Sequence, residues 1–324
     1  MDPRIVGSMA KNHGLISTES ARALGLTAND VRELLRTHQW RRLRRGVYVD
    51  AQEWESADEF VGRPLLRVRA AALHLPAELA LSHDSAALVH GLPVPDARIS
   101  LVHVSGAARG CERGGIKYHQ ARFTSDSVIS WQRVKILPPQ RTAVDLAREH
   151  GLTAGVAACD HLMRHGVSRA ELRAQLVQMH RWPGIRTAQR AVALADPGSE
   201  SYLESAARLL VIELGFGVPE TQFGLSDGVR AAWCDLRIGR HLFEVDGKSK
   251  YVDRPNALWN EKLRQDFLGG FKLGFSRINA RDVYTDRRAA KARLTREFLD
   301  TARRFGTDTA DLEPYRVPRR LRSS

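Results

Sequence analysis

The sequence predicts an α/β protein of more than one domain, and three observations lead to this fold class. The chain has 324 residues, which is enough for two or three separate hydrophobic cores. Short runs of β-branched and aromatic residues alternate with stretches whose apolar residues recur at helical spacing. The segment Ala195-Asp-Pro-Gly-Ser199 has the composition of a linker. We therefore expect domains at 1–60, 61–196 and 197–300, followed by a flexible basic tail at 301–324.

The charge of the chain predicts a polyanionic partner. Lysine and arginine number 50 against 37 acidic residues, so the net charge is +13 and the isoelectric point is near 10.2. Nucleic acid is the commonest polyanion that a basic protein binds. A solvated basic surface without a partner is the simpler alternative. We expect DNA as the partner.

The cysteines and the hydropathy predict a cytoplasmic protein. The three cysteines are far apart and have no metal-binding spacing, which favours a reducing compartment. We expect all three to be small core residues: Cys111, Cys159 and Cys234. No apolar run approaches the roughly 18 to 20 residues of a membrane span, and the start of the chain lacks the apolar stretch of a signal peptide.

The first residues predict a helix-turn-helix. Residues 3–12 have a helical pattern, and Ser17 or Thr18 can cap a second helix that Gly25 ends. Thr27 can cap a third helix, three residues before Asp30. Two short helices joined by a glycine-containing turn form this motif, in which the last helix is the candidate recognition helix.

A basic strand pair follows these helices and predicts a β-wing. The segment Gly46-Val-Tyr-Val49 has strand character and follows a run of arginines. Arginines beside a recognition helix suit phosphate contacts, which position a protein on DNA without reading its sequence. An arginine run can also be a solvated face. The candidate DNA-binding residues are Arg41, Arg42, Arg44 and Arg45 in the wing, with Arg32 and Arg36 on the third helix.

Three segments in the first half of the chain resemble AbiEi-family antitoxins of type IV toxin-antitoxin systems. They are Leu15-Ile-Ser-Thr18, Leu43-Arg-Arg-Gly-Val-Tyr48 and Leu81-Ser-His-Asp-Ser-Ala-Ala-Leu-Val-His-Gly-Leu-Pro93. The resemblance implies a winged helix that binds DNA and represses its own operon. It also implies a cognate toxin protein as a partner.

The middle region predicts a small mixed α+β arrangement that ends in helices. Residues 64–75 and 83–91 have helical patterns, and three strands are expected at 99–105, 116–123 and 134–137. Residues 141–195 are helical throughout, with breaks at glycines. Histidines are frequent, but none has the spacing of a metal-binding helix, so we expect structural roles for His74, His83, His90, His103, His119, His161 and His165.

A predicted β-hairpin in the last third brings two carboxylates together. Residues 233–238 and 241–246 read as strands joined by Gly239-Arg240, which pairs Leu236 with Phe243 and sets Asp235 opposite Glu244. Asp246 falls on the face of Glu244, whereas Leu236, Phe243 and Val245 fall on the opposite face and are expected in the core. Facing carboxylates repel, so a cation is expected there: Lys248, Lys250 or a hard divalent metal.

A third acidic residue points inward from the helix expected at 201–214. Glu204 lies beside the apolar stripe of that helix. Ser201-x-x-Glu204 fits a capping box, so this glutamate has either a capping role or a metal-related role, and the two are compatible.

These acids stand in segments that resemble the Vsr-like branch of the PD-(D/E)xK nuclease superfamily. The matching residues are Glu204, Asp235, Glu244-Val-Asp246-Gly-Lys-Ser-Lys-Tyr251 and Trp259-x-Glu-Lys-x-Arg-x-Asp266. The resemblance implies a restriction-endonuclease-like α/β domain with a central mixed sheet. It implies Mg²⁺, which Mn²⁺ can replace, held by Asp235 and Glu244 with Glu204 as a third candidate.

The lysine of that superfamily's active site has no direct counterpart here. Asp246 stands in its place, so the positive charge would come from Lys248, Lys250 or Lys262. Two functions follow as expectations. One is a DNA-binding Mg²⁺-dependent endonuclease serving defence or a toxin-antitoxin system. The other is an antitoxin-like repressor whose nuclease-like domain performs no chemistry.

Overall fold

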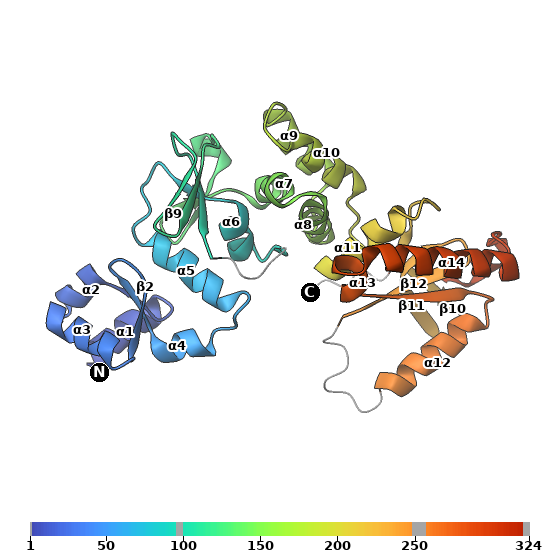
Figure 1. Ribbon diagram of the computed structural model, residues 1–324, viewed down its shortest axis with the longest axis horizontal. Coiled ribbons are helices and arrows are strands. Elements are labelled where there is room, and N and C mark those ends of the chain that lie inside the picture. Colours follow the sequence, from blue (N-terminus) through green and yellow to red (C-terminus); the bar gives the residue numbers. More distant parts are fainter. Residues whose placement is uncertain (1, 95–99, 248–256, 320–324) are drawn as a thin grey trace. The chain divides into compact units, whose positions relative to one another are not determined.

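The computed structural model describes residues 2–94, 100–247 and 257–319, without the side chains of residues 257–262. The chain forms two compact units, residues 1–149 and 150–324 (Figure 1). Three β-sheets carry helices around them, which confirms the predicted α/β class. In the described part of the chain, no helix has both the length and the apolar character needed to cross a membrane.

The first unit begins with three helices and a three-stranded sheet. The elements are α1 (Pro3–Lys11), β1 (Leu15–Ser17), α2 (Thr18–Ala23), α3 (Ala28–Arg36), β2 (Trp40–Arg44), β3 (Val47–Asp50) and α4 (Ala51–Ser56). The strands pair in the order β1-β3-β2. Ser17 caps α2, and Thr27 and Asp30 form a capping box on α3, so the predicted helix starts are confirmed.

A small core holds these elements together. The apolar faces of α1, α2 and α3 bury Ile5, Ala21 and Val31 against Ile16 of β1 and Trp40 of β2. The opposite face of α3 is therefore left to solvent, and it carries Arg32 and Arg36.

A six-stranded mixed sheet forms the rest of the first unit. Its strands run in the order β6-β7-β5-β4-β9-β8, with β5/β7 and β4/β9 parallel, which confirms the mixed sheet expected there. The elements are α5 (Gly62–Ala72), β4 (Ala80–Leu81), α6 (His83–His90), β5 (Val102–Ser105), β6 (Cys111–Arg113), β7 (Ile116–His119), β8 (Ile129–Trp131) and β9 (Val134–Ile136). Helix α7 (Pro139–His150) follows.

One cysteine prediction is wrong. Cys159 and Cys234 are buried, as expected of core residues, but Cys111 is exposed. Cys111 lies on β6, an edge strand whose residues are all exposed, so its side chain has no core to enter.

The second unit begins with three helices packed beside an α/β sandwich. The helices α8 (Leu152–Arg164), α9 (Arg169–Gln178) and α10 (Ile185–Leu194) precede α11 (Tyr202–Ile212). The sheet has the order β13-β12-β11-β10-β14, and only β12/β13 is parallel. Its first elements are β10 (Glu220–Ser226), β11 (Ala231–Ile238), β12 (His241–Asp246), α12 (Ala257–Gly269) and β13 (Gly274–Asn279).

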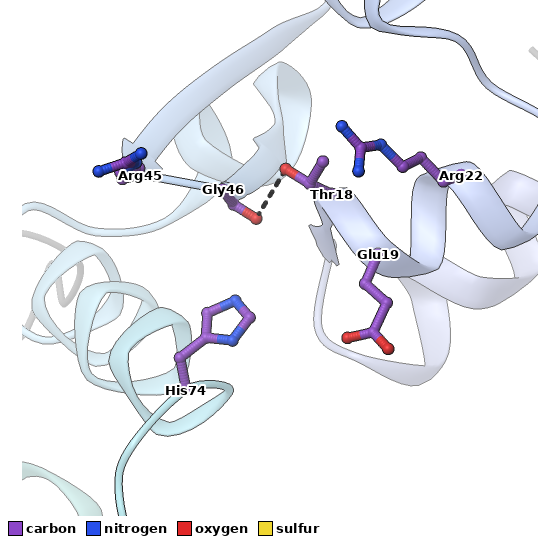
Figure 2. A pocket seen from close by; sticks show the side chains of 6 residues that line it. All are labelled: Thr18, Glu19, Arg22, Arg45, Gly46 and His74. Carbon is purple, nitrogen blue, oxygen red and sulfur yellow. Dashed lines mark hydrogen bonds between the residues drawn. The ribbon is translucent and has the colours of Figure 1, made fainter.

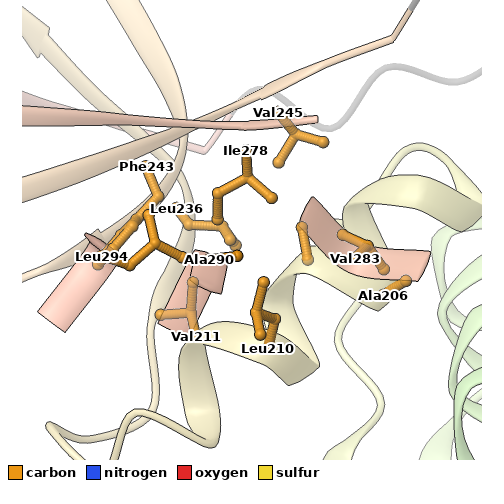
Figure 3. Packing of buried hydrophobic residues seen from close by; sticks show 11 residues of the cluster. Ala206, Leu210, Val211, Leu236, Phe243, Val245, Ile278, Val283, Ala290 and Leu294 are labelled. Carbon is orange, nitrogen blue, oxygen red and sulfur yellow. The ribbon is translucent and has the colours of Figure 1, made fainter. Parts of the chain in front are cut away.

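Helices cover both faces of this sheet. Figure 1 shows α11, α13 (Ala280–Tyr284) and α14 (Arg287–Phe305) on one face and α12 on the other. The first face packs Leu236, Phe243 and Val245 against the helices, as predicted (Figure 3). The second face packs Phe267 and Leu268 of α12 against the sheet. The sheet is therefore a sandwiched layer, and side chains of β12 alternate between two cores.

The predicted hairpin is present with the predicted register. Leu236 pairs with Phe243, Arg237 with Leu242 and Ile238 with His241. The regular pairing ends there, one step before the expected pair of Asp235 and Glu244. The Asp235 carboxylate instead accepts the Val245 N–H at 2.7 Å.

The segment expected as a linker is packed inside the second unit. Asp196 N–H donates to Asp160 of α8 at 2.6 Å, and Thr221 Oγ1 donates to Asp196 at 2.7 Å. Arg208 of α11 bonds Asp160 at 2.8 Å and the Leu194 carbonyl at 2.7 Å, and both charged side chains are almost fully buried. This network joins α8 to the α/β sandwich.

Residues 301–319, which were expected to belong to a flexible basic tail, contain defined elements. After α14 the chain forms a 3₁₀-helix, Ala310–Tyr315, and a short strand β14, Arg316–Val317, which pairs with β10. Leu312 is buried, and Trp233 donates its indole N–H to the Pro318 carbonyl at 3.1 Å. The arginine content predicts that this segment is solvated. Instead, buried Leu312 and the pairing of β14 with β10 hold the segment against the sheet of the second unit.

Candidate functional site

The arginines of the predicted wing lie on β2 and on the turn to β3. Arg41, Arg42 and Arg45 are exposed, whereas Arg44 is half-buried and burial lowers its pKa. Arg42 and Arg45 therefore present their side chains to solvent.

Arg41 is already engaged within the protein. Its guanidinium lies 4.7 Å from the centre of the Trp54 ring, and Glu55 is 3.9 Å away. Arg63 and Arg67 also approach this ring, at 5.3 and 5.5 Å. Three guanidinium groups lie within 5.5 Å of the Trp54 ring centre, and Glu55 offsets part of their charge.

The two arginines predicted on the third helix differ in their surroundings. Both are exposed on α3, away from the side chains that enter the core. Arg36 forms an ion pair with Glu33, with Nε donating at 2.8 Å, and this neutralises part of its charge. Arg32 is thus the better placed of the two to contact a polyanion.

A cleft of about 470 Å³ opens beside the wing. Figure 2 shows Arg22 of α2, Arg45 of the wing and His74 after α5 around it, with Glu19 on the α2 side. Thr18 Oγ1 donates to the Gly46 carbonyl at 3.3 Å and ties α2 to the turn. Sequence reasoning missed Arg22 and His74, because the packing of α2 brings the first beside Arg45 and the packing of α5 brings the second.

The carboxylates of the second unit occupy adjacent strands on the α12 side of the sheet. Glu244 is buried, and Arg264 of α12 donates to it at 2.7 Å. The same nitrogen of Arg264 donates to the Trp233 carbonyl at 2.7 Å. The cation expected near these acids is therefore supplied, at least in part, by an arginine.

Burial raises the pKa of Glu244 above its usual value, because the charged carboxylate loses water. Arg264 acts in the opposite direction, and the nearby charge of Asp235 adds to the upward shift. The charge of Asp235 is therefore close enough to affect the ionisation of Glu244.

The remaining residues predicted beside this pair have different positions. Asp246 lies 3.3 Å from Arg277, at the end of β12. Lys248 and Lys250 lie outside the described residues, and Lys262 is on α12 with its side chain also outside them. Among the described residues, the candidate site therefore consists of Asp235, Glu244 and Arg264.

Glu204 is a helix cap. Its carboxylate accepts the Glu200 N–H at 2.7 Å and the Ser201 hydroxyl at 3.1 Å, while Glu204 N–H donates back to Ser201 Oγ at 3.1 Å. Within the described residues, Glu204, Asp235 and Glu244 do not gather as three ligands around one point. The capping role is confirmed, and the pair Asp235 and Glu244 remains the candidate metal site.

A different group converges in the first unit. His83, His103 and His119 each offer a ring nitrogen within 4.8 Å of the others, and among the described residues no other set of three or more histidine, cysteine or acidic ligands does so. The sequence predicts structural roles for these three histidines and does not predict that they converge. Helical spacing could not reveal them, because they come from α6, β5 and β7.

No family model matches the chain. Two curated proteins of Mycobacterium tuberculosis, one from strain CDC 1551 / Oshkosh and one from strain ATCC 25618 / H37Rv, are each 27% identical to it over 175 residues. Both are described as uncharacterized. The match covers 52% of this chain and 63% of each relative. The chain is therefore similar to mycobacterial proteins whose names state no activity.

Proposed function

We propose that the protein binds DNA through a winged helix-turn-helix in its first unit. The observation that supports this most directly is the placement of exposed Arg42 and Arg45 beside α3, in a chain of net charge +13. The order of three helices and a three-stranded sheet supports the winged-helix assignment. The wing would position the protein on the phosphate backbone. The binding would take place in the cytoplasm.

Helix α3 would face the base edges of the major groove. Its exposed side carries Asn29, Arg32 and Arg36, and arginine and asparagine are the side chains that pair best with guanine and adenine. The cleft formed by Arg22, Arg45 and His74 would take a backbone phosphate beside the helix. This division separates positioning contacts from sequence-reading contacts.

The test compares two double variants in fluorescence anisotropy with a labelled duplex. Replacing Arg42 and Arg45 by alanine should weaken binding about tenfold or more, since charge-assisted hydrogen bonds to phosphate are lost. Arg288→Ala with Arg296→Ala removes two exposed arginines of α14 and is the charge-matched control. Equal losses in both double variants would show that only net charge matters.

A second candidate function is metal-dependent cleavage of the bound DNA by the second unit. Its support is the interaction of Asp235 with Glu244 across β11 and β12, together with the resemblance to Vsr-like nucleases. Both acids would hold Mg²⁺ or Mn²⁺, which polarises the scissile phosphate and lowers the pKa of bound water. Arg264 would then have to share or release Glu244.

Cleavage is tested with supercoiled, linear and mismatched DNA, with Mg²⁺ or Mn²⁺ added. Asp235→Asn and Glu244→Gln should each abolish the metal-dependent nicking, because neither amide oxygen carries the charge that holds the ion. Asp126→Asn, an exposed change in the first unit, is the control and should cut normally. Absence of cleavage by the unaltered chain would favour a repressor that performs no chemistry and has a cognate toxin as partner.

A further inference from the structure

Three imidazoles from separate elements of the first unit meet at one place. His83 begins α6, His103 lies in β5, and His119 ends β7. The parallel strands pair His103 with Lys117 and Ser105 with His119, so His103 and His119 project from the same face of the sheet. The N-terminus of α6 is fixed against β5, because the His103 N–H donates to Ser85 Oγ at 2.7 Å and the Ser82 N–H donates to the His103 carbonyl at 3.0 Å.

The distances between these rings suit ligands of one ion. His119 Nε2 lies 3.2 Å from His103 Nδ1, and one nitrogen of each ring lies within 4.8 Å of the others. Two nitrogens bound to a tetrahedral Zn²⁺ at about 2.0–2.1 Å are roughly 3.4 Å apart. The His83 and His119 rings are stacked with centroids 3.7 Å apart, so one of these rings must turn out of the stack for both to bind the same ion.

The neutral form of histidine is the one that binds metals, and burial favours that form at all three rings. Burial lowers the pKa of His103 to about 4 and places the pKa of His83 well below its usual value. Burial also lowers the pKa of His119. His119 Nε2 and His103 Nδ1 lie at hydrogen-bond distance, 3.2 Å, and a bound ion would replace this contact.

Acidic side chains lie close to the histidines. Asp145 Oδ1 is 4.0 Å from His83 Nε2. Asp84 Oδ2 is 3.2 Å from His103 Nδ1, the nitrogen that also faces His119, so this carboxylate would lie beside the ion. Ser82 Oγ lies 3.0 Å from His83 Nδ1. Such partners orient the rings and offset the charge of a divalent ion.

The basic groups near the cluster are paired with acids. Lys117 forms an ion pair with Glu149, and Arg141 and Arg148 both bond Asp145 at 2.9 and 2.6 Å. Lys117 thus has a carboxylate of its own, whereas Arg141 and Arg148 share the carboxylate of Asp145.

One buried hydroxyl beside the cluster has no hydrogen-bond partner among the described residues. Ser105 Oγ is fully buried, and Ser105 is the register partner of His119 on the same face of the sheet. An unsatisfied buried hydroxyl costs about 1–3 kcal/mol unless a water or ligand group meets it. A water bound to an ion held by the three histidines would be such a group.

We propose that His83, His103 and His119 bind one divalent transition-metal ion, with Zn²⁺ as the best match, and that its fourth position holds a water. Three imidazole ligands with an open position form a tetrahedral site. His119 is only half-buried, so the ion reaches the site from that side. The ion ties the start of α6 to β5 and β7. This site is separate from the DNA contacts and from the carboxylates of the second unit.

The test measures metal binding to the full chain after a chelator has removed bound ions. Competition with a chromogenic Zn²⁺ chelator should give one equivalent of tight binding, and Co²⁺ should give the intense visible absorption of a tetrahedral site. His103→Gln and His119→Asn should each lower Zn²⁺ affinity at least about 100-fold. Zn²⁺ should also raise the melting temperature of the unaltered chain but of neither variant.

His165→Asn is the matched control, because His161 and His165 are also stacked, with ring centroids 4.2 Å apart, but have no third histidine. This variant should bind Zn²⁺ as the unaltered chain does. Circular dichroism establishes that each variant is folded, and His119→Asn at the half-buried position keeps the test valid if the His103 variant unfolds. Less than one-tenth equivalent of Zn²⁺ or Co²⁺ on the unaltered chain, or full affinity in folded His119→Asn, would overturn the proposal.

Discussion

At the scale of single residues, Glu204 illustrates how a local motif and a long-range site compete for one side chain. Its carboxylate is used by the Glu200 N–H and the Ser201 hydroxyl at the start of α11. Sequence predicts this well, because a capping box joins residues three positions apart. The same is true of Thr27 and Asp30 on α3.

We predict that Glu204→Ala lowers the free energy of unfolding by about 1 kcal/mol, the typical contribution of a cap. Ser201→Ala, which removes the hydroxyl that accepts the Glu204 N–H, should lower the free energy of unfolding by a similar amount. Urea unfolding with and without Mg²⁺ measures both effects. A Mg²⁺-dependent stabilisation that Glu204→Ala alone removes would contradict the capping role and restore this glutamate to a metal site.

The partner of Glu244 shows what a residue-level pattern leaves open. Facing carboxylates require a cation, and the sequence predicts a lysine or a metal from the residues that follow directly. The structure places Arg264 there, twenty residues later in the chain. Its approach depends on how α12 packs on the sheet, and strand periodicity contains no information about that packing.

At the scale of elements, local patterns predict the helices and the hairpin, but not which distant strands become neighbours. The turn Gly239-Arg240 fixes the register of β11 and β12 within a few residues. The histidine cluster, in contrast, requires β7 to lie beside β5 and α6 to begin next to both. Such pairings are set by the whole sheet, so the sequence of each element cannot reveal the cluster.

A buried polar junction between β12, β13 and α14 leads to a pH prediction. His241 contacts Thr301 Oγ1 at 2.7 Å through Nδ1 and Ser276 Oγ at 2.8 Å through Nε2. Burial lowers the pKa of His241 to about 4, although Glu297 acts in the opposite direction. The unfolded histidine has a pKa of about 6.5, so between these values the unfolded chain binds a proton that the folded chain does not.

The second unit should therefore lose stability as pH falls from about 6.5 to about 4, by up to about 1.4 kcal/mol per pH unit from this residue. Below that range the folded state is protonated as well, and the loss from His241 levels off. Urea unfolding at a series of pH values, compared with His241→Asn, isolates the effect. A variant with the same pH slope as the unaltered chain would show that His241 does not titrate in this way.

At the scale of the whole molecule, composition predicts the partner class and the fold class, while the division into units follows from packing. The net charge of +13 needs no structure to be seen. The position of the 195–199 segment can be seen only in the structure, where Asp196 forms hydrogen bonds with Asp160 and Thr221 of the second unit. A linker composition therefore does not reveal whether the segment is exposed or docked.

The central claim is that the wing of the first unit binds DNA phosphates. The most direct measurement is the affinity of the full chain for a short duplex over a range of salt concentrations. We predict that the logarithm of the association constant falls linearly with the logarithm of salt concentration. The slope of the Arg42→Ala, Arg45→Ala variant should be smaller in magnitude by about 1.8, which is about 0.9 for each lost phosphate contact. A slope near zero for the unaltered chain, or an unchanged slope in this variant, would contradict the account.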